Sequence, residues 1–287
     1  MKRRARQINI VFRVLQQEQL QTLVMKDMPP YLRIAAAWAF ITVAFCGCSE
    51  NSPTQPLLKE AEVRVLGDIP LSEEKAIVVT NPIGAVVLMG EGREQSVSWL
   101  LDKTVQAATA QKAREQFDAI VLSQQSRNDT LFVSVAAPLN SAIMTYAADL
   151  SLNVPLALPC AITQAHYGFA YDLAAPLLIQ NTSYAEIQRH NASCQIDLPE
   201  GGIVIEMALP RDGICHAHTG KGDILLRLPA TTSALIAAES KSGKVMHSGL
   251  VFVTLDQTAS ALTGTLGLGM GEIRLETANG NIQLEGY

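Results

Sequence analysis

The side chains best suited to chemistry are two histidines at alternate positions, His216 and His218, in the stretch CHAHTGKGD. Alternate residues of a β-strand project to one side, so both imidazoles could reach one metal ion. Asp212, Asp223 or His247 would have to supply a third ligand, and the spacing fixes none of them there. Because paired exposed histidines are common on ordinary strands, they are a weak metal candidate and we expect no bound metal.

Other catalytic and nucleotide-binding motifs are incomplete. Ser72-Glu73-Glu74-Lys75 matches S-x-x-K, but the companion motifs of such a nucleophile are missing. The glycine-rich segment at 267–271 departs from G-x-G-x-x-G and precedes a strand-like pattern instead of a helix, which argues against a dinucleotide site. We therefore predict no catalytic residue, no cofactor and no enzymatic activity.

The elements that carry these residues are predicted to be short β-strands. From residue 60 onward, β-branched runs are separated by Gly, Asn, Pro and Asp, which is typical of strands and turns. Three stretches share one template, in which a strand ends in Thr or Ser and a glycine follows three residues later. The pairs are Thr219 with Gly222, Ser240 with Gly243, and Thr277 with Gly280. Glycine accepts positive φ at a corner, and we expect the hydroxyl to bond a turn amide.

Alternation assigns the two sides of these strands. The predicted inward residues are Cys215, Ala217, Ile224, Leu226, Leu228, Ile273, Leu275, Thr277, Ile282 and Leu284. The predicted outward residues are His216, His218, Arg227, Arg274, Glu276, Asn281, Gln283 and Glu285. Repeated corners with stacked inward rows predict an all-β fold, an irregular single-stranded parallel β-helix or β-solenoid. The glycines at 264–271 would then lead into a last, uncapped rung.

One short inserted helix is predicted near residues 104–119. Ala110, Ala113, Phe117 and Ile120 recur with helical spacing in a stretch without Gly or Pro. Residues 120–124 and 131–135 then alternate around a turn at 126–129 and predict a hairpin. Residues 75–89 look like two strands around a turn at 81–84.

The N-terminal segment predicts where in the cell the protein is located. After Arg33, residues 34–45 form an uncharged apolar run that is shorter than a membrane-spanning helix and suits a secretory signal. The following Cys46-Gly47-Cys48-Ser49 resembles the bacterial lipoprotein signal. That resemblance implies cleavage of residues 1–47 and acylation of Cys48, palmitate included. Ser49 in place of Asp implies outer-membrane retention, with the protein facing the periplasm or the cell surface.

The remaining chain divides into a tether and a body. Residues 48–59 are polar and contain prolines, which predicts a flexible tether, and residues 60–287 are predicted to form the β-solenoid domain. Residues 1–47 contain seven Lys or Arg and two Asp or Glu, whereas the other 240 residues contain 15 and 25, a net charge of −10. A body this acidic repels polyanions, so we expect no nucleic-acid partner.

Three cysteines follow Cys48, namely Cys160, Cys194 and Cys215. An oxidising envelope permits one disulfide among three thiols. Cys194 and Cys215 are 21 residues apart, about one coil, and both are predicted to face the core, so they form the favoured pair. A Cys160–Cys194 bond and three reduced thiols are the alternatives.

The glycine-rich tail from Gly264 to Tyr287, with the Thr-x-x-Gly corners before it, resembles the bacterial β-strand-repeat family that bears the label adhesin. The resemblance covers roughly residues 75–287. It implies a secreted or membrane-attached, parallel β-helix-like domain, and it brings no residue roles because the label defines no site.

The resemblance implies a non-enzymatic envelope protein that binds an unknown protein or polysaccharide, or copies of itself. Two alternatives stay open. One is a structural envelope scaffold that self-assembles. The other is a carbohydrate-active enzyme on a β-helix, which would need clustered acids on one outward row.

Overall fold

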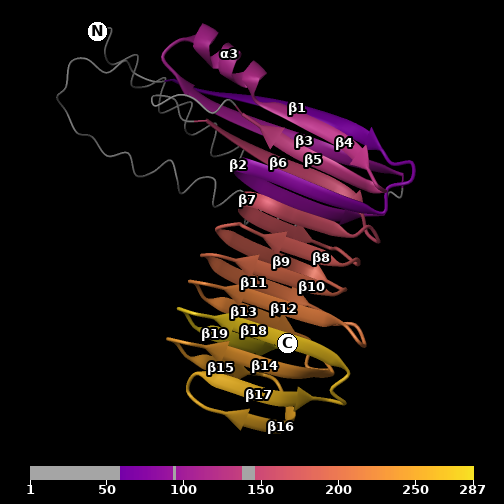
Figure 1. The fold of residues 1–287 in the computed structure, drawn as a ribbon, viewed down its shortest axis with the longest axis vertical. Helices are drawn as coiled ribbons and strands as arrows, with labels where there is room; N and C mark the ends of the chain where they lie inside the picture. The colour runs from indigo at the N-terminus through magenta and orange to yellow at the C-terminus, as the bar shows by residue number, and fades with distance from the viewer. Residues whose placement is uncertain (1–58, 93–94, 138–145) are drawn as a thin grey trace, which may run out of the picture. The chain divides into compact units, whose positions relative to one another are not determined.

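A computed structural model describes residues 59–92, 95–137 and 146–287, all within one compact unit, Pro56–Tyr287. The predicted signal, Cys48 and nearly all of the predicted tether lie outside the described residues. Within them the fold is all-β: nineteen strands join in one large mixed sheet, and one helix, α3 (Ala110–Ala119), interrupts them (Figure 1). No helix in these ranges is long and apolar enough to span a membrane.

The longest strands lie before residue 172. In chain order they are β1 (Lys59–Pro70), β2 (Ala76–Glu91), β3 (Ser96–Ala107), β4 (Val121–Arg127), β5 (Thr130–Ala136), β6 (Tyr146–Pro155) and β7 (Cys160–Tyr171).

Shorter strands follow. They are β8 (Leu177–Gln180), β9 (Tyr184–His190), β10 (Cys194–Leu198), β11 (Gly202–Met207), β12 (Ile214–Thr219), β13 (Ile224–Leu228), β14 (Ala234–Ser240), β15 (Val245–Ser248), β16 (Phe252–Gln257), β17 (Ala261–Leu266), β18 (Gly271–Thr277) and β19 (Ile282–Gly286).

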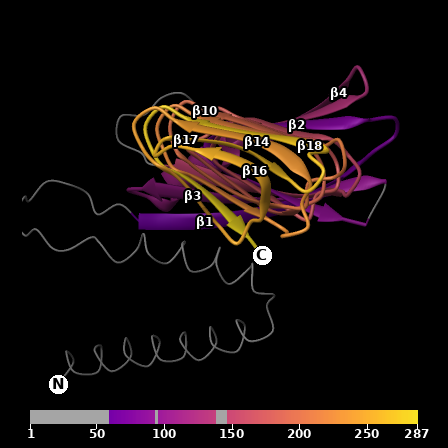
Figure 2. The same ribbon diagram turned by 90° about the horizontal axis from the view of Figure 1, so that it is seen from below.

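Hydrogen bonding arranges the strands in two rows. The first row runs β4, β5, the first half of β2, the first half of β7, β8, β10, β12, β18, β14, β17 and β16. The second row runs β1, β3, β6, the second half of β2, the second half of β7, β9, β11, β13, β19 and β15. Seen from one end, β14 and β18 of the first row lie in a layer opposite β1 and β3 of the second (Figure 2).

The pairings in the middle of both rows are parallel; antiparallel pairs flank them at both ends of the first row and at the β1 end of the second. Parallel pairing runs from β5 to β14 in the first row and from β6 to β15 in the second. We call a pair of strands joined through a corner, one from each row, a rung. Among the described strands β1, β4, β15 and β16 pair on one side only, so the sheet is not closed.

The core lies on the side of each row that faces the other row. Along β14 and β18 buried residues alternate with exposed or half-buried ones, as a strand with one covered face requires. Every residue predicted to face inward is buried, and Ile282 and Leu284 have no exposed surface. The inward residues are Ile, Leu, Val and Ala in the main, and they form one continuous hydrophobic cluster.

The last two strands lie between earlier ones. β18 pairs with β12 and with β14, and β19 pairs with β13 and with β15. The prediction of a last, uncapped rung is therefore wrong. The rung β14–β15 precedes β18–β19 along the chain, but in space β18–β19 lies between β12–β13 and β14–β15.

A hairpin covers the end that the sequence pattern left open. β17 pairs antiparallel with β14, and β16 pairs antiparallel with β17 (Figure 1). The amide of Gln257 donates to the carbonyl of Val245 at 3.1 Å, and Phe252 contacts the His247 ring at a centroid distance of 5.1 Å. The hairpin thus bridges both rows.

The predicted corners stack into one column, which we call the corner column. Its hydroxyl residues are in register, since Thr277 lies opposite both Thr219 and Ser240. Each hydroxyl donates to a glycine carbonyl of the next rung: Thr219 to Gly201 at 2.9 Å, Thr277 to Gly222 at 2.9 Å and Ser240 to Gly280 at 2.6 Å. The acceptor is a carbonyl, so the expected bond to a turn amide is wrong. The hydroxyls link rungs and do not close their own turns.

Two local expectations also need correction. β2 continues through residues 81–84, because Asn81 is buried there and its amide donates to the carbonyls of Ala85 at 2.9 Å and Ala148 at 2.6 Å. The helix begins only at Ala110, where the Thr109 hydroxyl accepts from a helix amide, and residues 104–107 belong to β3. The predicted β4–β5 hairpin is confirmed.

Candidate functional site

Four rings gather on the outward side of the second row. Tyr167, Phe169 and Tyr171 of β7 and Tyr184 of β9 form what we call the aromatic face. Ring centroids are 6.4 Å apart between Tyr167 and Phe169, and 6.5 Å apart between Phe169 and Tyr171. The planes of Phe169 and Tyr171 differ by 7°, and Tyr184 lies 6.0 Å from Phe169. Tyr167 is 51% exposed.

The strand alternation of β7 explains why three rings project together. Odd-numbered residues from 167 to 171 point outward while Gly168 and Ala170 point into the core. Only 5% of the chain is Phe, Trp or Tyr, so four rings on two neighbouring strands are a local concentration. On the other side of β7, Val87 and Met89 of β2 lie beside Phe169 and Tyr171 and extend the apolar surface.

Polar groups border the rings on β9. Tyr184 donates its hydroxyl to Glu186 Oε2 at 3.0 Å, and the Gln188 amide donates to Glu186 Oε1 at 2.6 Å. In register, Glu186 lies beside Phe169 and Gln188 beside Tyr171. Burial, and next the charge of Glu186, raise the pKa of Tyr171 and Tyr184 well above the ordinary tyrosine value, so both hydroxyls keep their protons.

An ion pair closes one end of the aromatic face. Arg189 donates from Nε to Asp172 Oδ1 at 2.5 Å and from Nη2 to Oδ2 at 2.6 Å. The bidentate geometry connects the residue that follows β7 to β9 and balances both charges. Rings, a carboxylate with its hydrogen-bond donors and a neutralised ion pair therefore share one outward surface.

The histidines of the sequence prediction lie on the first row, as expected on its outward side. His216 Nε2 is 3.1 Å from Glu272 Oε1, and His218 Nδ1 is 2.8 Å from Asp197 Oδ1. Glu272 belongs to β18 and Asp197 to β10, the strands on the two sides of β12, so each imidazole has its own acidic partner. Among the described residues no group of three or more His, Cys, Asp or Glu side chains is arranged to hold a metal ion.

The three described cysteines are buried. Cys194 and Cys215 lie opposite each other on β10 and β12, with their sulfurs 3.6 Å apart, and a bond between them stays a prediction. Leu177 of β8 separates Cys160 from Cys194 in the same column. Cys160 and Cys194 are therefore two strand spacings apart, roughly 9.5 Å, which is too far for the alternative Cys160–Cys194 disulfide. Burial raises the pKa of Cys160 to about 12.

The S-x-x-K match does not assemble a catalytic pair. The backbone and hydroxyl of Ser72 both donate to Glu74 Oε2, at 2.7 and 3.3 Å. Lys75 instead reaches Asp129 at 2.8 Å. The hydroxyl of Ser126 and the amide of Ser72 lower the pKa of Glu74 to about 2, so its carboxylate holds this turn together.

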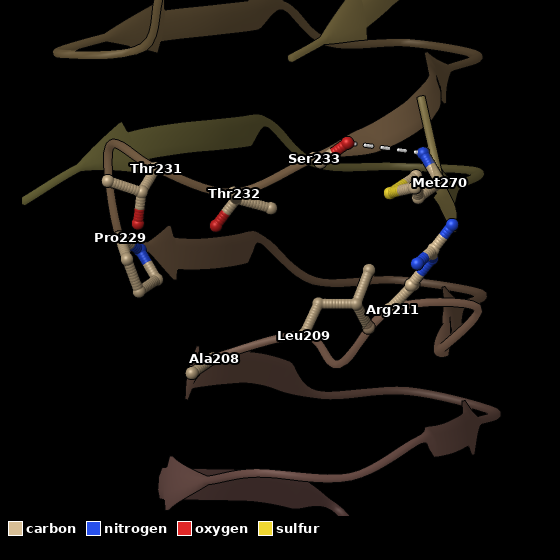
Figure 3. Close-up of a pocket in the computed structure, with 8 residues that line it drawn as sticks. All are labelled: Ala208, Leu209, Arg211, Pro229, Thr231, Thr232, Ser233 and Met270. Carbon is tan, nitrogen blue, oxygen red and sulfur yellow. Dashed lines mark hydrogen bonds between the residues drawn. The ribbon is translucent and has the colours of Figure 1, made fainter. Parts of the chain in front are cut away.

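A small cavity of about 190 Å³ opens beside the turn that follows β11 (Figure 3). Its lining residues are Ala208, Leu209, Arg211, Pro229, Thr231, Thr232, Ser233 and Met270. The Ser233 hydroxyl accepts from the backbone amides of Leu268 at 2.9 Å and Met270 at 3.3 Å. Ser233 therefore has a structural role, since it holds the turn before β18.

The sequence prediction missed the aromatic face. The signal was present as alternate aromatic residues in HYGFAYD at 166–172. It was overlooked because its strands have irregular corners, and because Tyr184 joins the rings only through the pairing of β7 with β9.

No protein-family model and no curated protein matches this sequence. Solved structures do resemble it at low identity. A candidate cell adhesion protein from Clostridium sporogenes aligns with a TM-score of 0.38 and 10% identity over 79% of this chain and 100% of its own. A candidate adhesin from Bacteroides fragilis aligns with a TM-score of 0.32 and 11% identity over 78% and 97%.

A third structure, a candidate lipid-binding protein from Parabacteroides distasonis, aligns with a TM-score of 0.26 and 8% identity over 78% of this chain and 96% of its own. These likenesses extend over most of each chain but are too distant to assign a function. What the fold and the site define is a class: an all-β protein with an open, aromatic sheet face.

Proposed function

We propose that this chain is a non-enzymatic, lipid-anchored binding protein of the bacterial cell envelope, an adhesin-like module with a β-solenoid surface. The signal-like segment before Cys48 supports an acylated N-terminus and retention at the outer membrane. The partner is a protein or a polysaccharide of the envelope or of a neighbouring cell.

The register of the parallel strand pairs supports the β-solenoid interpretation. From β7 to β15, strands of the two rows alternate along the chain, and each pairs in parallel with the equivalent strand of the next rung. The corner column adds one hydroxyl-to-carbonyl bond at each of three steps. Such stacking buries an inward row at every rung and leaves the outward rows available to a partner.

The observation that carries the binding role is the aromatic face. Tyr167 is half exposed, and half-buried rings surround it on a surface that the rest of the described chain leaves open. Aromatic residues concentrate binding energy because they bury a large area at little conformational cost. Core packing does not require three outward rings in a row on β7.

Retention on isolated bacterial cell envelopes tests this role. We expect the purified protein to co-sediment with envelopes and the double variant Tyr167→Ala, Phe169→Ala to lose at least about tenfold in affinity, that is about 1.4 kcal/mol. Leu268→Ala is the matched control, because Leu268 is 82% exposed and lies in the turn before β18. If the double variant bound like wild type, the aromatic face would not be the binding surface.

Anchoring is tested separately by intact mass. We expect the membrane-extracted protein to begin at Cys48 with a diacylglyceryl group and to become unmodified in Cys48→Ala. A chain that retained residues 1–47, or that began at another residue without lipid, would contradict the anchor.

Self-assembly is a second candidate, and the edge strand β16 favours it. Among the described strands β16 pairs only with β17, and the apolar residues in and beside it are exposed: Val251 at 80%, Val253 at 69% and Leu255 at 44%. An unpaired apolar edge can add a strand of another copy. Sedimentation velocity of Val253→Lys against wild type decides the question: concentration-dependent assembly that the charge abolishes would support it, and a monomeric wild type would exclude it.

The enzyme alternative has no specific observation in its favour. Some outward acids are paired with basic partners, as in Arg227–Glu285 at 2.9 Å and Arg274–Glu276 at 2.6 Å. Asp197, Glu276 and Glu239 lie in one outward row with His218, but among the described residues no three such side chains are arranged to hold a metal ion.

A further inference from the structure

The position of the aromatic face within the sheet limits what can bind there. β7 lies between β2 on one side and β8 and β9 on the other, so its backbone amides and carbonyls are used in the ladder. A peptide that adds as an extra strand needs unpaired backbone groups. Among the described strands those occur at β1, β4, β15 and β16 instead. A ligand on the aromatic face therefore contacts side chains alone.

The rings offer apolar faces with polar edges. Aromatic side chains carry a negative face and a positive edge, and tyrosine adds a hydroxyl at its tip. A pyranose ring matches this chemistry, because one of its faces presents C–H groups while its rim presents hydroxyls. Three rings spaced 6.4 and 6.5 Å apart along β7 suit a chain of such units better than a single one.

The polar border of the face suits hydroxyl groups. Each oxygen of Glu186 already accepts one bond, from Tyr184 and from Gln188, and a carboxylate oxygen can accept a second. The Gln188 carbonyl adds a further acceptor. Sugar hydroxyls can donate to these oxygens.

The charges on the aromatic face favour neutral ligands over anionic ones. The outward residues of the second halves of β2 and β7 and of β9 are Ala85, Val87, Met89, Glu91, His166, Tyr167, Phe169, Tyr171, Tyr184, Glu186 and Gln188. None of these is Lys or Arg, and Arg189 at the end of β9 is balanced by Asp172. With Glu186 at its centre, the face repels phosphate, sulfate and uronate groups.

An acyl chain is a poorer match than a sugar chain. Lipid tails need an enclosed apolar cavity, and the aromatic face is an open sheet surface. The two cavities described, of about 190 and 270 Å³, are lined by other residues.

We propose that the aromatic face binds a neutral polysaccharide chain laid along β7, with its sugar rings against Tyr167, Phe169 and Tyr171 and its hydroxyls on Glu186 and Gln188. The inference rests on the proposed binding function and names the partner class. It predicts contact through side chains only, and little dependence on ionic strength, because no ion pair forms with the ligand.

The experiment uses competition against envelope retention. Envelopes are digested with proteinase K, their polysaccharide is extracted, and anion exchange separates a neutral from an anionic fraction. We expect the neutral fraction to displace the wild-type protein from untreated envelopes. Raising sodium chloride tenfold should change retention by less than about twofold.

Variants test the named contacts. We expect Tyr167→Ala to weaken binding of the neutral fraction about tenfold, Tyr167→Phe by less than about threefold, and Leu268→Ala not at all. Glu186→Gln keeps the shape of the side chain but removes its charge and one acceptor oxygen, so it should weaken binding about three- to tenfold.

Failure of this inference is distinct from failure of the proposed function. If the protein is retained on envelopes but only the anionic fraction competes, or if proteinase K abolishes retention, the partner is not a neutral polysaccharide and the binding role stands. If the wild-type protein is not retained on envelopes at all, both proposals fail.

Discussion

The corner column and the aromatic face are both rows of side chains in register along the sheet, yet they differ in repetition. The column recurs at three consecutive steps with the same chemistry, a hydroxyl that donates to a glycine carbonyl of the next rung. The aromatic face occurs once, on β7 and β9, and faces outward. A contact that links neighbouring rungs can be repeated from rung to rung, whereas a cluster of outward rings is not needed for that stacking.

The two regions also differ in what holds their residues. Gly222 and Gly280 are confined by backbone atoms, with φ values of 153° and 155° that L-residues rarely adopt. Tyr167 is half exposed and no such restraint acts on it. Substitutions in the column should therefore affect folding, and substitutions on the face should affect binding.

The largest expected effect is that of Gly222→Ala. A Cβ at this position would lie 2.1 Å from the carbonyl oxygen of Gly201, and the φ of 153° would be strained as well. Steric overlap and backbone strain together should lower the free energy of unfolding by about 3–5 kcal/mol. Urea denaturation measures the change.

Gly92→Ala is the matched control, because no heavy atom lies within 4 Å of a Cβ built there. Its unfolding free energy should stay within about 0.5 kcal/mol of wild type. Equal losses in the two variants would show that Gly222 is not confined by its neighbouring rung.

The repeated features are those that the sequence predicted best. A hydroxyl residue with a glycine three residues later predicts a corner, because only glycine fits the backbone of such a bend. This pattern occurs at Thr219, Ser240 and Thr277. Alternation then assigned Ile282 and Leu284 to the core, where both are buried. Local geometry decides these properties, so a local pattern carries them.

The order of the rungs could not be predicted in the same way. β12, β14 and β18 share one template, so any of them could pair with any other. The placement of β18 between β12 and β14 depends on the β16–β17 hairpin, which pairs with β14 on its other side. The aromatic face also depends on long-range pairing, because Tyr184 reaches Phe169 from a different strand.

Thr277→Val tests the contribution of one hydroxyl of the corner column to stability. The substitution keeps the shape of this buried side chain but removes its hydroxyl. The Gly222 carbonyl then loses the hydrogen bond that Thr277 donates. An unsatisfied buried acceptor should lower the free energy of unfolding by about 1–2 kcal/mol. Thr263→Val on β17 is the control, since Thr263 is exposed, and should change it by less than about 0.5 kcal/mol. A loss in both variants alike would assign the effect to strand propensity.

The aromatic face contributes to stability in a pH-dependent way. Burial raises the pKa of Tyr171 above the ordinary value of about 10, so the folded protein keeps a proton that the unfolded chain loses. This contribution is complete below about pH 10 and disappears as the pH rises further, toward the raised pKa. Because the ring is partly exposed, the loss should be about 1 kcal/mol.

Tyr171→Phe removes the titrating group and keeps the ring. Between about pH 8 and about pH 10.5, its urea midpoint should decline less than that of wild type. A decline of equal steepness in both proteins would show that Tyr171 does not lose solvation on folding.

Tyr167→Ala should have the smallest effect on folding and a large effect on binding. The ring is 51% exposed, so its removal should change the free energy of unfolding by less than about 0.5 kcal/mol while envelope affinity falls about tenfold. Phe169→Ala should lower both, because Phe169 is half-buried and contacts the other three rings. Paired urea and co-sedimentation measurements on the two variants separate these outcomes. If Tyr167→Ala lost stability in proportion to affinity, the outermost ring would belong to the packing of the sheet, and the distinction between repeated structural contacts and a single binding face would not hold.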